Sequence, residues 1–139
     1  MISQVSVSEK IFDAVFKAKE TLDNEYQELS DWITDIIENE NRLKVRECEI
    51  CSSNKKLELH HIRGRKHGNE IITICQKCHK ILTDKQRLWG QSWLDPNAKN
   101  KDTFLIRGLI NVCELKHQKT GKEIYKLIAE ELTEGFSYE

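Results

Sequence analysis

The stretch that decides the fold is residues 48–79, CEICSSNKKLELHHIRGRKHGNEIITICQKCH. It contains two Cys-x-x-Cys pairs, Cys48 with Cys51 and Cys75 with Cys78. Two residues between cysteines let one tight turn present two sulfurs, and four thiolates bind zinc tetrahedrally. The spacing therefore predicts a structural Zn²⁺ site. The alternative, a redox-active cysteine pair, needs a thioredoxin-like βαβ context that this segment lacks.

The residues between and after the cysteine pairs predict a β-hairpin followed by a helix. Residues 55–62 alternate apolar and polar side chains as a half-buried strand does, and the β-branched run 70–74 predicts a second strand. Residues 63–69 are polar, contain glycine and form the connection, and residues 79–88 follow as a helix. Zinc would stabilise a segment that is too small to have a core of its own.

Outside this centre the hydrophobic pattern is helical. Apolar residues recur at helical spacing after Ser8, a suitable N-cap, and from Tyr26 to Leu43. Similar patterns cover residues 103–117 and 124–132, whereas residues 89–96, with the only proline, are expected to be irregular. The sequence predicts one compact α+β unit with an N-terminal helical arm (1–45), a central module (46–90) and a C-terminal helical segment (91–139).

Charge is unevenly distributed along the chain, although the net charge is −1. Residues 1–41 contain three Lys/Arg and ten Asp/Glu, whereas residues 42–91 contain twelve Lys/Arg and five Asp/Glu. Residues 92–139 contain seven and eight, which completes the totals of 22 and 23. A basic centre is the electrostatic footprint of a protein that binds a polyanion, although charge also segregates by chance.

The remaining composition predicts an intracellular protein, in the cytoplasm or in a host cell, without membrane attachment. No apolar run approaches the roughly 20 residues that a membrane span needs. The first residues, MISQVSVSEK, lack the basic start and apolar core of a secretory signal. In a reducing compartment, paired cysteines favour metal binding over disulfides. The fifth cysteine, Cys113, is expected in the core.

Histidines gather in the same central segment. His60 and His61 lie between the cysteine pairs, and His79 directly follows the second pair. A four-cysteine zinc site does not need them, and together they offer metal ligands and a general base. With Cys-x-x-Cys, His-His and Cys-x-x-Cys-His in this order, the segment resembles the HNH nuclease family. The resemblance covers roughly residues 46–90 and none of the flanking helices.

The resemblance implies a ββα-metal, treble-clef-like fold, in which a hairpin and a helix hold a catalytic divalent ion such as Mg²⁺ or Mn²⁺. Carried over position by position, it makes His60 and His79 the ligands of this ion. His61 would be the general base, and Asn69 would orient His61. Because adjacent strand residues point to opposite faces, both histidines serve one site only if the strand bends or ends there. The alternative is that one of them packs or meets solvent.

The chain departs from the family pattern at two places. The pattern places its asparagine five residues before the first cysteine of the second pair, where this chain has Glu70 and Asn69 is one residue early. Glu70 is therefore a possible substitute at the site. Many family members also have His or Asn at the position of Thr83. The third ligand is then open, and Asp84 or water could complete the shell.

The basic connection after the first strand is expected to contact DNA phosphates. Arg63, Arg65 and Lys66 carry its charges, and guanidinium groups form paired hydrogen bonds with phosphate. The alternative is a solvated loop tip. His67, in the same connection, is expected at the surface rather than as a ligand.

The sequence thus predicts a metal-dependent HNH endonuclease that hydrolyses phosphodiester bonds in DNA, by nicking or by double-strand cleavage. It would carry structural Zn²⁺ and catalytic Mg²⁺, Mn²⁺ or another divalent ion, and a homodimer is expected if both strands are cut. One alternative is a zinc-stapled DNA-binding module without catalysis. Another is a protein-interaction adaptor, in which zinc only stabilises the fold.

Overall fold

Helices and one small sheet make up the part of the chain that the computed structural model describes, residues 6–19, 23–38 and 45–135. The sheet is antiparallel and has two strands, so the predicted α+β class is confirmed. The elements in chain order are α1 (Val7–Lys19), α2 (Asp23–Glu38), β1 (Leu57–His61), β2 (Ile71–Cys75), α3 (Gln76–Gln86), α4 (Gln91–Leu94), α5 (Lys101–Thr120) and α6 (Glu123–Gly135).

The strands β1 and β2 form the predicted hairpin. In their register Leu57 lies opposite Cys75 and His61 lies opposite Ile71. The Ile62 backbone N–H donates to the Glu70 carbonyl over 3.0 Å and closes the connection between the strands. Helix α3 begins directly after β2, so the second cysteine pair lies at the junction of a strand and a helix.

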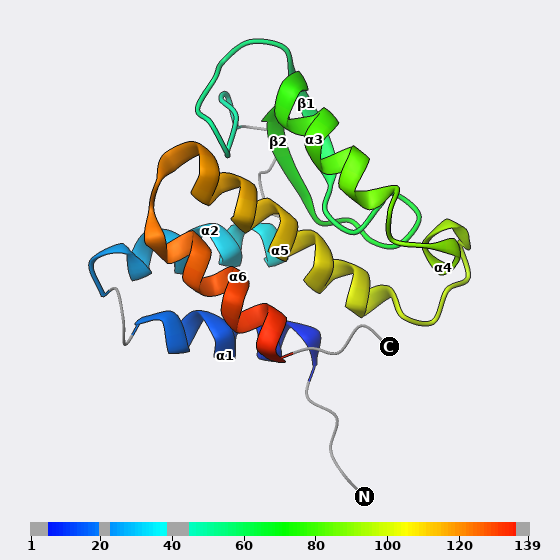
Figure 1. The fold of residues 1–139 in the computed structure, drawn as a ribbon, viewed down its shortest axis with the longest axis horizontal. Coiled ribbons are helices and arrows are strands. Elements are labelled where there is room, and N and C mark those ends of the chain that lie inside the picture. The colour runs from blue at the N-terminus through cyan, green and yellow to red at the C-terminus, as the bar shows by residue number, and fades with distance from the viewer. Residues whose placement is uncertain (1–5, 20–22, 39–44, 136–139) are drawn as a thin grey trace, which may run out of the picture.

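Helix α5 lies between the hairpin module and the other helices (Figure 1). Strands β1 and β2 with α3 are on one side of it, and α6 and α1 are on the other, with α2 packed against both of these helices. A continuous hydrophobic core joins the two sides. It includes Ile62, Ile72, Ile74 and Leu82 of the module, Leu105, Leu109 and Val112 of α5, and Ile11, Ile33 and Ile128 of the other helices.

Three expectations about the helices need correction or limits. The N-cap of α1 is Ser6, whose Oγ accepts a hydrogen bond from the Glu9 N–H at 3.2 Å, rather than Ser8. The segment expected to be irregular contains the short helix α4. Leu43, the last residue of the second helical pattern, lies outside the described residues.

No described helix combines the length and the apolar character that crossing a membrane requires.

The first cysteine pair is anchored to both β2 and α2 by one carboxylate. Glu49 accepts hydrogen bonds from the Trp32 indole N–H at 2.9 Å and from the Thr73 backbone N–H at 2.6 Å. Its own N–H donates to the Thr73 carbonyl at 2.8 Å. Hydrogen bonds to a charged group are stronger than those between neutral groups. Glu49 therefore fixes the position of the cysteine turn relative to the helices.

Replacing Gly108 with alanine is expected to destabilise the fold by about 1–3 kcal/mol. A Cβ atom at this buried position of α5 would collide with the backbone carbonyl of Ile62, at the end of β1, so α5 would have to move away from the module. Chemical denaturation measures the loss. Gly135→Ala is the control, because a Cβ there meets no atom within 4 Å; an equal loss in both variants would refute the close approach.

Candidate functional site

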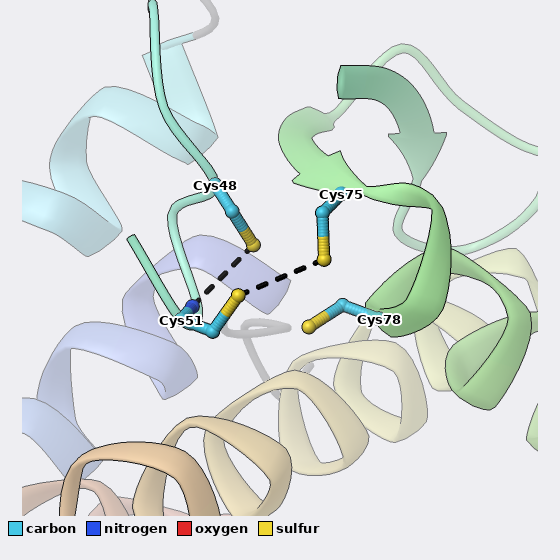
Figure 2. A group of neighbouring side chains, drawn as sticks. All are labelled: Cys48, Cys51, Cys75 and Cys78. Atoms are coloured by element: carbon cyan, nitrogen blue, oxygen red, sulfur yellow. Dashed lines mark hydrogen bonds between the residues drawn. The ribbon is translucent and has the colours of Figure 1, made fainter. Parts of the chain in front are cut away.

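The four cysteines of the two pairs converge at one point (Figure 2). Their sulfur atoms all lie within 4.8 Å of one another, and the sulfurs of Cys51 and Cys75 are 3.6 Å apart. A tetrahedron of sulfurs around zinc, with Zn–S bonds of about 2.3 Å, has edges of roughly 3.8 Å. The cluster therefore fits a zinc ion, and the predicted metal-binding set Cys48, Cys51, Cys75 and Cys78 is brought together.

Local backbone geometry presents the first two sulfurs. The Cys51 N–H donates to the Cys48 sulfur at 3.4 Å, and the Ser52 N–H donates to the Cys48 carbonyl at 2.9 Å. Ser52 has a left-handed φ of 67°, which turns the chain back towards β1. The Cys48 N–H then donates to the Ser53 carbonyl at 2.7 Å and closes the turn.

The second pair lies at the beginning of α3. Burial opposes the ionisation of Cys75, but the Cys78 backbone N–H and the neighbouring thiols lower its pKa to about 7. Burial raises the pKa of Cys78 and, together with the neighbouring thiols, that of Cys51. Since zinc binds thiolates, it must displace protons from most of the cluster. Metal affinity will therefore fall as the pH falls.

Beside the cysteines, β1 and α3 bring two histidines and a carboxylate together. The rings of His60 and His79 meet edge to face with centroids 5.3 Å apart. Glu58 lies two residues before His60 in β1, and its Oε1 is 2.7 Å from His79 Nδ1. Glu58 was not among the residues predicted for the site. Strand alternation was the available signal, because residues two apart share a face.

The surroundings of His60 and His61 favour neutral imidazole at both residues. His60 is only 2% exposed. Burial, followed by the nearby His79 and His61, lowers the pKa of His60 to about 3. His61 is half-buried, and burial, the charge of Arg65 and the nearby His79 lower its pKa as well. Neutral imidazole is the form that binds metals and accepts protons.

The carbonyl groups at the end of β1 are held by α3. Gln86 is buried, and its side-chain amide donates to the carbonyls of His61 at 3.0 Å and Ile62 at 3.1 Å. This contact fixes the backbone immediately beside the candidate base. An amide that satisfies two carbonyls in the interior also removes the cost of burying them without a partner.

The connection between the strands splits the predicted phosphate-binding residues into two groups. Arg63 is 15% exposed, and its guanidinium donates to both carboxylate oxygens of Glu70 at 2.9 Å and to Asp102 at 3.2 Å. Arg65 and Lys66 are exposed. Arg63 and Glu70 thus have each other as partners within the connection, whereas the charges of Arg65 and Lys66 face solvent.

His67 does not lie at the surface, so that expectation was wrong. It is 5% exposed, its Nε2 is 2.6 Å from the Trp93 carbonyl oxygen, and its ring packs against Phe104 at 4.8 Å between centroids. The Trp93 indole N–H in turn donates to the Arg63 carbonyl at 3.1 Å. Residues of α4 and the beginning of α5 therefore cover the side of the connection that carries His67, whereas Arg65 and Lys66 stay exposed.

Asn69 and Asp84 were the other residues predicted for the site, and Asp84 lines the same hollow as Glu58 and His79. Asn69 is exposed in the connection. Asp84, on α3, pairs with Lys80 at 2.9 Å and with Arg87 at 3.4 Å. Within the described ranges, the four cysteines are the one group of three or more His, Cys, Asp or Glu ligand atoms that converges. A third protein ligand for a catalytic ion is not among these residues.

Comparison with known proteins identified no homologue of this chain. No protein family, curated protein sequence or solved structure matches the chain. The HNH resemblance therefore depends on the motif residues and on the geometry in which they lie.

Proposed function

We propose that the protein is a metal-dependent HNH endonuclease that hydrolyses phosphodiester bonds in DNA. The observation that carries the proposal is the contact between His60 and His79 across β1 and α3, directly beside the four-cysteine cluster. A structural zinc site does not explain why two histidine rings meet next to it. A pair of metal ligands beside a candidate base would explain this contact.

The two histidines of the pair are suited to hold a divalent ion. Glu58 accepts the Nδ1–H of His79, and this leaves Nε2 of His79 with its lone pair free for a metal. His60 is neutral, as a ligand must be. When bound, Mg²⁺, Mn²⁺ or a similar ion would stabilise the negative charge that develops during phosphodiester hydrolysis. Water is proposed to complete the coordination shell.

The remaining steps belong to His61 and the basic connection. We assign His61 as the general base that removes a proton from the water attacking phosphorus. Its lowered pKa keeps it unprotonated at neutral pH. We propose that Arg65 and Lys66, which are both exposed, bind backbone phosphates. Cutting both strands would take a second copy of the site, as a homodimer supplies.

Incubating supercoiled plasmid DNA with the zinc-loaded protein and one divalent metal at a time tests the proposal. We expect nicked or linear plasmid with Mg²⁺ or Mn²⁺ and none with a chelator of these ions. Binding without cleavage in every metal would favour the non-catalytic DNA-binding module. No DNA affinity even at low salt would favour the protein-interaction adaptor, because phosphate contacts dominate binding under that condition.

Glu58→Ala is expected to raise the concentration of divalent metal needed for half-maximal cleavage by about 10–100-fold. The carboxylate orients His79 through the 2.7 Å contact with Nδ1, so its loss frees the ring to turn. Cleavage at saturating metal should recover most of the wild-type rate. Glu130→Gln, at an exposed position of α6, is the control. An unchanged metal requirement in Glu58→Ala would contradict the positioning role.

Cleavage should be lost as the pH falls through the lowered pKa of His61, because the protonated ring cannot act as a base. Arg65→Gln removes a positive charge that disfavours the imidazolium form. The pKa of His61 should then rise, and the acid limb of kcat/KM should move to higher pH. A pH series for both proteins measures this shift, whatever the change in the maximum rate. An acid limb in the same place would remove His61 as the titrating base.

A further inference from the structure

A groove lined by lysines lies over the four-cysteine cluster. It encloses about 400 Å³ and is lined by Cys51, Cys75 and Cys78 together with four lysines. Lys55 and Lys56 precede β1, Lys77 lies in the first turn of α3, and Lys119 lies in the last turn of α5. Segments far apart in the sequence thus contribute ammonium groups to one hollow.

The positive charge of this groove exceeds what the cysteines require. Zinc with four thiolates carries a net charge of about −2, whereas the four lysines carry one positive charge each. No aspartate or glutamate lines the groove. All four lysines are exposed, and within the described part of the chain none of them belongs to a salt bridge. The surplus charge is available to an anionic ligand.

The backbone at Lys56 supports a role for its side chain. Lys56 has a left-handed φ of 52°, a conformation that disfavours residues other than glycine and asparagine. Its carbonyl accepts a hydrogen bond from the Gln76 N–H at 3.0 Å, which fixes the turn against the beginning of α3. The turn would form more easily with glycine. A lysine held there adds a charge to the groove at a cost to the backbone.

This groove adjoins the histidine pair. Gln76 and Lys77 line it and also line a neighbouring hollow of about 420 Å³ that contains Glu58 and His79. In that neighbouring hollow Asp84 offsets the charges of Lys80 and Arg87, as their ion pairs show. Unpaired positive charge is therefore concentrated on the cysteine side of Lys77.

We infer that the lysine groove binds the phosphate backbone of the DNA that the histidine site cuts, so that the strand continues from His79 across the cysteine cluster. This inference rests on the proposed function, which makes DNA the ligand of the groove. It adds a contact surface separate from the connection that carries Arg65 and Lys66. The zinc cluster would then place lysines along the DNA as well as stabilise the fold.

The test is the salt dependence of duplex DNA binding, measured by fluorescence anisotropy on zinc-loaded protein without a catalytic metal. Lys55→Gln with Lys119→Gln should weaken Kd about tenfold at low salt. It should also reduce the slope of log K against log salt by about 1.8, since each lost phosphate contact removes about 0.9. Lys17→Gln with Lys126→Gln makes the same change in charge at exposed positions of α1 and α6 and should leave the slope unchanged.

Lys56→Gly separates binding from folding. Glycine accepts the left-handed backbone, so the Tm should stay the same or rise while DNA affinity falls. A wild-type slope in the Lys55 and Lys119 variant would overturn the groove and leave the nuclease proposal standing. Unchanged DNA binding with loss of zinc would assign the lysines to the thiolates and overturn the groove too. A reduced slope in a protein that never cuts DNA would support the groove and refute the nuclease.

Discussion

Cys78→Ala is expected to release the zinc and to unfold the hairpin and α3. Cys78 is 1% exposed and contributes one of the four converging sulfurs. An isolated two-stranded hairpin is at best marginally stable in water. Structural zinc contributes about 10–16 kcal/mol of binding free energy in small zinc domains near pH 7, which is comparable to the whole stability of a typical protein, about 5–15 kcal/mol. The variant should therefore lose its cooperative thermal transition or melt far below wild type.

Metal analysis and thermal unfolding followed by circular dichroism measure this effect. Cys113→Ala is the matched control, because Cys113 is equally buried but lies on α5 outside the cluster. It should retain one zinc per chain and lose about 0.5–3 kcal/mol, as an ordinary core substitution does. A Cys78→Ala protein with a full complement of zinc and the wild-type Tm would show that the cysteines are not a structural metal site.

His61→Ala is expected to lower the rate of DNA cleavage by about 10²–10⁴-fold, the range that a general base contributes. Folding should be preserved, because the contact of His61 with Gln86 uses the backbone carbonyl, which alanine retains. Zinc content, Tm and DNA affinity should all match wild type. Single-turnover cleavage at saturating protein separates the loss of rate from any loss of binding.

Two comparisons sharpen the assignment of His61. His117 lies in the last turn of α5 and pairs with Glu123, the first residue of α6. His117→Ala should therefore leave cleavage unchanged. Added imidazole should restore part of the rate to His61→Ala, because a free base can occupy the space that alanine leaves. A purely structural histidine would show no such rescue. Cleavage by His61→Ala at the wild-type rate would contradict the assignment.

The four-cysteine cluster and the hairpin could be predicted because their signals are local. Each cysteine pair spans a single turn, and the alternation before His60 and the β-branched run from Ile71 to Ile74 each correspond to one strand. Local spacing also placed His79 at the beginning of a helix directly after the second pair. Once the strands pair and α3 follows, the contact between His60 and His79 results from the chain path.

The remaining features depend on contacts between distant segments. His67 lies in a polar connection, and its burial comes from Trp93 and Phe104, which follow α3 in the chain. Arg63 was predicted to contact DNA phosphates, but its guanidinium forms ion pairs with Glu70 and Asp102. No periodicity within the connection contains this information. The lysine groove could not be predicted from composition either, because its four lysines come from three separate segments of the chain.

One plasmid assay that compares zinc-loaded wild type with His61→Ala in Mn²⁺ tests whether the protein is a nuclease with His61 as its base. Both proteins should be purified identically and shown to carry zinc and to bind the plasmid. We expect wild type to convert supercoiled DNA to nicked or linear forms only when Mn²⁺ is present, and we expect His61→Ala to leave the plasmid supercoiled. Failure of folded, zinc-loaded wild type to cut DNA in Mn²⁺, Mg²⁺ or any other divalent metal would contradict this expectation, as would equal cutting by the two proteins.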